Sequence, residues 1–104
     1  MDIIDRFEAM LADGQDSALL RFSLGSAYLK TGLYTSAIDH LLHALEMDKN
    51  YSAAWKHYGM ALDKNGQTDD AIAAYKSGIA IAEKKGDIQA AKEMKVFLKR
   101  LEKE

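Results

Sequence analysis

The sequence contains no cysteine and no proline among its 104 residues. The absence of cysteine excludes a disulfide framework, a thiolate metal site and a cysteine nucleophile, and it suits a reducing compartment. Because proline is absent, no position is forced to kink, and glycine provides the strong breaks in the chain. The first residues show no basic stretch followed by an apolar run, so we expect no secretory signal.

An excess of one charge and long apolar runs are also missing. The formal net charge is −2, which gives no reason to expect nucleic acid or an anionic membrane as a partner. No stretch approaches the roughly 18 apolar residues that span a bilayer. We therefore expect one soluble, cytoplasmic domain that binds neither nucleic acid nor membrane.

The sequence repeats itself at an offset of 34 residues, a period typical of helical repeat proteins. Seven pairs of similar size and polarity fall on each other at this offset: Gly25 and Gly59, Gly32 and Gly66, Ala37 and Ala71, Ile38 and Ile72, Leu41 and Tyr75, Ala44 and Gly78, and Leu45 and Ile79. Glycine inside a helix costs up to about 1 kcal/mol relative to alanine, so matched internal glycines indicate close packing of helices.

Apolar residues within each repeat recur at helical spacing and never alternate as in a half-buried strand. The pattern predicts helices over 18–30, 35–47 and 52–64, and a fourth from Thr68 to Gly86. We expect Asp16 or Ser17 to cap the first of these helices and Thr68 to cap the last, with Asp69 and Asp70 in its first turn.

The small and large residues of the two units follow a shared order. The first unit has Leu24-Gly25-x-x-Tyr28, Gly32-x-Tyr34, Ala37, Leu41 and Ala44, and the second has Trp55-x-x-Tyr58-Gly59-x-x-Leu62, Gly66, Ala71, Tyr75 and Gly78. This order resembles the tetratricopeptide repeat family. The resemblance implies an all-α fold of antiparallel helix hairpins, 18–51 and 52–85, stacked as a short right-handed superhelix. The sequence departs from the family at Arg21, where an aromatic is usual, and at Lys49 and Glu83, where proline is usual.

The two flanks each predict one further helix. Residues 2–13 carry an apolar stripe (Ile3, Ile4, Phe7, Met10 and Leu11) that we interpret as a half-repeat covering the start of the stack. Residues 87–103 carry an apolar stripe on one face of a predicted helix and mostly charged residues on the rest, and Asp87 can cap the start of this helix. We interpret it as the cap that repeat arrays need, and a coiled-coil partner helix is the alternative.

No residues form a convincing catalytic set. His40 and His43 lie three residues apart and could hold a metal weakly, but we interpret them as polar residues on a solvated face. Ser26 lacks the sequence context of a nucleophile elbow, and phosphate-binding glycine loops are absent. We therefore predict no enzyme, no metal and no cofactor, and keep a small hydrolase or metal enzyme only as a contrast.

The resemblance further implies that the first helix of each hairpin lines a concave groove. The implied groove residues are Leu19, Phe22, Ser26, Leu29, Lys30, Ala53, Lys56, Met60, Asp63 and Lys64. An apolar strip beside lysines suits a peptide with apolar anchors and an acidic group, unless the terminal helix folds back over the strip. Phe22, Ser26 and His57 occupy positions of the carboxylate clamp known in one subtype, which predicts that this clamp is missing.

Two functions remain open at this point. The first is a protein–protein adaptor that binds a protein or peptide in the groove. The second is a homo-oligomerisation module, for example a homodimer through the terminal helices, because two repeats are fewer than the three usually needed for a stable stack.

Overall fold

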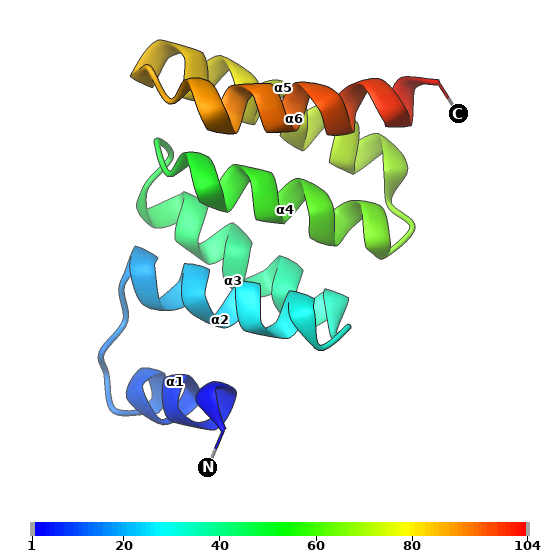
Figure 1. The fold of residues 1–104 in the computed structure, drawn as a ribbon. Helices are drawn as coiled ribbons and strands as arrows, with labels where there is room; N and C mark the ends of the chain where they lie inside the picture. The colour runs from blue at the N-terminus through cyan, green and yellow to red at the C-terminus, as the bar shows by residue number, and fades with distance from the viewer. Residues whose placement is uncertain (1, 104) are drawn as a thin grey trace.

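The protein is described by a computed structural model covering residues 2–103. These residues contain no strand and form six helices: α1 (Ile3–Ala12), α2 (Ala18–Lys30), α3 (Tyr34–Met47), α4 (Ser52–Lys64), α5 (Thr68–Lys85) and α6 (Ile88–Glu102). Consecutive helices run antiparallel and stack from α1 at one end to α5 and α6 at the other (Figure 1). This arrangement confirms the predicted all-α right-handed superhelix of helix hairpins.

Membrane insertion through a helix finds no support in the described part of the chain, since none of its helices is both long and apolar enough to cross a bilayer.

Side-chain hydrogen bonds cap the starts of α1, α2 and α6. Ser17 caps α2, because its hydroxyl accepts a hydrogen bond from the Leu20 backbone N–H at 3.0 Å. Asp16, the other candidate cap, instead pairs with Arg21, its Oδ1 lying 2.9 Å from the guanidinium Nε. Asp87 caps α6 as predicted, because its carboxylate accepts a hydrogen bond from the Ala90 backbone N–H at 3.3 Å.

The predicted cap of α5 is wrong. The helix begins at Thr68 itself, Gln67 takes the cap position, and no side chain accepts a hydrogen bond from the first turn. Because Thr68 is already helical, its hydroxyl is not placed to cap the first turn. The Gln67 side-chain amide donates to the Asp70 carboxylate at 2.9 Å instead, and Asp69 and Asp70 lie in the first turn as expected.

Neighbouring helices touch where glycine removes a side chain. A Cβ added to Gly25 would lie 2.5 Å from Leu41 Cγ, and one added to Gly78 would lie 2.6 Å from Met94 Sδ. A Cβ on Gly59 would overlap the ring of Tyr75. These three contacts join α2 to α3, α4 to α5 and α5 to α6, so the internal glycines of the repeat have a packing function.

The prediction that His40 lies on a solvated face is wrong. Its side chain is buried, with its ring stacked on Tyr28 at a centroid distance of 5.5 Å. The Tyr28 hydroxyl donates to the Glu8 carboxylate at 2.7 Å, so α1 lies over this side of α2 and α3. The helical pattern missed this burial because the cover comes from other helices, from Glu8 on α1 and from Arg21 and Tyr28 on α2. His43 remains half exposed.

The contacts of His40 define its protonation state. Arg21 Nη1 lies 3.2 Å from His40 Nδ1. A guanidinium can only donate, so Nδ1 is the acceptor and the proton is assigned to Nε2, which faces Glu8 at 4.0 Å. Burial lowers the pKa of His40 below its ordinary value, the Glu8 carboxylate opposes this effect, and Arg21 adds to it.

We predict that Gly59→Ala destabilises the protein by roughly 1–3 kcal/mol, because the new methyl group would press against the Tyr75 ring. Helix propensity alone predicts the opposite sign, a gain of up to about 1 kcal/mol. Urea unfolding followed by circular dichroism measures the difference. In a Tyr75→Ala background the same substitution should cost much less, and an unchanged cost would show that this contact is not the cause.

We also predict that the free energy of unfolding falls as the pH drops below about 6.5, the ordinary histidine pKa, because the unfolded chain then binds a proton that folded His40 resists. The loss should continue down to the lowered folded pKa. Stability curves measured between neutral and mildly acidic pH should be flatter for His40→Gln, which retains an acceptor for Arg21 but does not titrate. Equal slopes for both proteins would contradict the assignment.

Candidate protein-binding groove

The helices α2, α4 and α6 form one face of the molecule. They run in the same direction in a single layer, with α3 and α5 behind them (Figure 1). α4 contacts both α2 and α6, whereas α6 does not contact α2. The terminal helix therefore does not cover the apolar strip on α2, and the side chain of Leu19 is 65% exposed.

A stacked cluster forms the middle of this face. Ser26 Oγ lies 2.8 Å from His57 Nδ1, which ties α2 to α4. The His57 ring stacks on Phe22 at a centroid distance of 5.0 Å, and Phe22 also contacts Tyr51. Burial lowers the pKa of His57, and the nearby cations Lys56 and Lys30 lower it further. Phe22, Ser26 and His57 are thus half-buried groups that hold two helices at a fixed spacing.

An ion pair ties α4 to α6 on the same face. Lys56 Nζ lies 3.1 Å from Glu93 Oε1, and the Lys56 side chain is 22% exposed. Lys56 was predicted as one of the groove lysines, but much of its charge is already neutralised by Glu93. This glutamate was not among the predicted groove residues.

Two hollows open on this face, one at each end. The first lies between α1 and α2 and is lined by Asp2, Ile3, Ile4, Phe7, Ser23, Ser26, Ala27, Lys30 and Thr31. The second is lined by Met60, Asp63, Lys64, Tyr75, Phe97, Arg100 and Leu101. Their volumes, about 340 and 280 Å³, lie near the lower limit of roughly 300 Å³ for small-molecule pockets. Each is therefore better suited to one or two apolar side chains than to a whole substrate.

Cations lie at both hollows. Lys30 and Lys64 are exposed, and neither has an ion-pair partner among residues 2–103. The guanidinium of Arg100 lies 5.9 Å from the centre of the Phe97 ring, a distance at which a cation is attracted to an aromatic face. Asp63 is the one acidic residue lining the second hollow, so its rim has a positive balance.

The ten predicted groove residues divide into three groups. Met60, Asp63 and Lys64 come together around the second hollow, and Ser26 and Lys30 around the first. Phe22 and Lys56 lie between the hollows in the contacts described above. The remaining three line neither hollow: Leu19 is exposed, Leu29 is half-buried and packs near Ala37 and Leu41, and Ala53 is half-buried.

The residues that the sequence analysis missed come from α1, α5 and α6, and include Glu93, Phe97 and Arg100. The cap residues of α2 and α4, Ser17 and Tyr51, are separated by the repeat period, but Asp87 follows Tyr51 by two residues more. The reason is that α5 has 18 residues where α3 has 14, while the loop that follows α5 is two residues shorter than the loop that follows α3. The repeat register therefore does not carry over to α6, and only a shifted alignment would find these residues.

The serine–histidine contact does not form a catalytic site. Ser26 lies in the interior of α2, where backbone N–H groups are used within the helix and cannot stabilise an oxyanion. His57 contacts Ser26 and Phe22, and no carboxylate orients its ring through a hydrogen bond among the described residues. Over the same residues, no group of three or more histidines and carboxylates is placed to hold a metal ion.

Comparison with known proteins agrees with this architecture. The model of the tetratricopeptide repeat family matches residues 4–52 and 24–88. A TPR repeat-containing protein of Pseudomonas aeruginosa is 46% identical over 101 residues, which cover 97% of this chain and 96% of the relative.

Solved structures show the same fold. The solution structure of a Bordetella parapertussis protein is 45% identical in sequence and superposes with a TM-score of 0.88. The match covers 99% of this chain and 90% of that protein's chain. The crystal structure of a tetratricopeptide repeat domain protein from Salinibacter ruber is 26% identical, with a TM-score of 0.76, over 83% of this chain and 97% of its own. The chain therefore belongs to the tetratricopeptide repeat family, whose members generally mediate protein–protein interactions.

Proposed function

We propose that this protein is a non-catalytic adaptor that binds a segment of another protein on the face formed by α2, α4 and α6. The observation that carries the proposal is the pair of hollows, each with apolar lining residues, that have Lys30 at one and Lys64 and Arg100 at the other. A bound segment would place an apolar side chain in each hollow and acidic side chains against the cations. We place this activity in the cytoplasm, without a nucleic acid or membrane partner.

The contacts between the two hollows favour this function because they connect α2, α4 and α6. The Ser26–His57 contact and the Lys56–Glu93 ion pair hold the three helices side by side, so the two hollows keep a fixed separation. A preformed groove loses little conformational freedom when a ligand binds, which favours affinity. Specificity then depends on the distance between the apolar side chains of the ligand.

We do not expect the ligand to be the carboxylate end of a chaperone tail. The clamp positions are taken by Phe22, Ser26 and His57, and His57 contacts the other two. None of the three carries a permanent positive charge that could pair with a terminal carboxylate. An internal acidic segment fits the exposed lysines better.

We predict that peptides selected for binding from a random display library combine acidic residues with two separated apolar residues. The Leu19→Ala/Lys64→Glu variant should bind a selected peptide at least tenfold more weakly by calorimetry, because it loses exposed apolar surface and reverses a charge at the second hollow. Both side chains are exposed, so the fold should be unaffected.

The matched control is Leu42→Ala/Lys84→Glu, which makes the same two changes at exposed positions of α3 and α5. Its peptide affinity should equal that of the wild type. If both variants weaken binding equally, or if selected peptides carry no acidic bias, the α2–α4–α6 face is not the binding site.

A further inference from the structure

The two ends of the helix stack carry opposite charge. The exposed side of α1 and its flanking residues, here called the acidic end, has Asp2, Asp5 and Asp13 against a single arginine, Arg6. The exposed side of α6 and its C-cap, here called the basic end, presents Lys92, Lys95, Lys99 and Lys103. Within the described part of α6, Glu102 is the one exposed acid, and it lies 3.8 Å from Lys76.

Both ends also expose apolar side chains. On the acidic end, Ile3 is 55% exposed and Met10 is 37% exposed, and α1 contains no fully buried residue. On the basic end, Ile88 is 65% exposed and Val96 is 49% exposed. These apolar side chains are therefore available for a contact with another molecule at each end of the stack.

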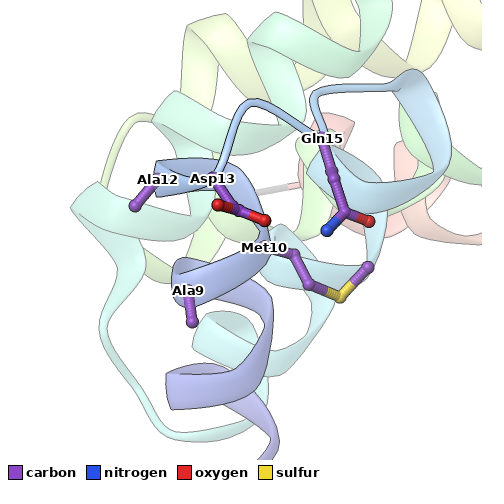
Figure 2. A pocket seen from close by; sticks show the side chains of 5 residues that line it. All are labelled: Ala9, Met10, Ala12, Asp13 and Gln15. Carbon is purple, nitrogen blue, oxygen red and sulfur yellow. The ribbon is translucent and has the colours of Figure 1, made fainter.

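A hollow at the acidic end can receive a side chain. It is lined by Ala9, Met10, Ala12, Asp13 and Gln15, at the end of α1 and in the loop that follows (Figure 2). The two alanines leave room over the helix, Met10 supplies an adaptable apolar wall, and Asp13 places a carboxylate at the rim.

The apolar residues of the two ends are similarly spaced. Ile3 and Met10 are seven residues apart, about 10 Å along a helix, and Ile88 and Val96 are eight residues apart, about 12 Å. Lys92 lies between the two apolar residues of α6, and Lys99 follows them by one turn. Lys95 is already paired with Glu83 at 2.8 Å, whereas Lys92 and Lys99 have no ion-pair partner among residues 2–103.

We propose that the protein associates with itself head to tail, with the basic end of one copy packed on the acidic end of the next. Val96 enters the hollow beside Met10, and Lys92 and Lys99 pair with Asp5 and Asp13. Contacts between two acidic or two basic ends are opposed by like-charge repulsion, so the association is not a symmetric dimer. This inference uses the ends of the stack and does not depend on binding at the α2–α4–α6 face.

The geometry also predicts the kind of assembly. Each copy keeps one unused end after the contact forms, so head-to-tail association continues into open chains or closes into rings. The contact is small and rich in lysine, which makes it weak and sensitive to salt. Added copies would extend the stack of helices beyond one chain.

Sedimentation velocity over micromolar to millimolar protein concentrations tests the proposal. The mean mass should rise with concentration at low ionic strength and return to that of a monomer at high salt. Asp5→Lys/Asp13→Lys should remain monomeric at low ionic strength. Asp39→Lys/Asp69→Lys, with the same charge change at exposed positions of α3 and α5, should associate like the wild type.

A mixing experiment separates the head-to-tail contact from other modes. Lys92→Glu/Lys99→Glu should also be monomeric alone, but it keeps an unchanged acidic end. An equimolar mixture with Asp5→Lys/Asp13→Lys, which keeps an unchanged basic end, should therefore associate again. A wild type that stays monomeric at millimolar concentration and low salt, or a mixture that does not associate, overturns the proposal.

Discussion

The close approach of neighbouring helices at glycine is the contact on which the rest of the structure depends. Leu41 and Tyr75 occupy the space beside Gly25 and Gly59 that a Cβ would otherwise fill. Interiors packed at crystal-like density tolerate little added volume, so these contacts fix how the helices of each hairpin meet. Met94 likewise occupies the space beside Gly78, and this contact packs α6 against α5.

Polar contacts then fix the layer that these hairpins present. Ser26 with His57 and Lys56 with Glu93 connect α2, α4 and α6 in turn. Each contact is partly shielded from water, which strengthens it relative to an exposed pair. Ser26, His57 and Lys56 therefore fix the spacing of α2, α4 and α6.

The two terminal helices differ from the hairpins between them. α1 is held by Glu8, which accepts from Tyr28 and faces His40, while its apolar side chains remain partly exposed. α6 buries Ala90, Ala91, Met94 and Leu101 on one side and presents lysines on the other. Repeat arrays need polar outer surfaces to stay soluble, and opposite charges at the two ends make those surfaces complementary as well.

The sequence by itself determined the helices, their hairpin pairing and the family, because small and large residues at a constant offset specify which faces meet. The family resemblance also implied Met60, Asp63 and Lys64 as neighbours on one face, and they lie around one hollow. Only the tertiary structure decided that His40 is buried and that Lys56 is paired, since both depend on residues distant in sequence. The contribution of α6 was likewise hidden, because the longer α5 shifts it out of the repeat register.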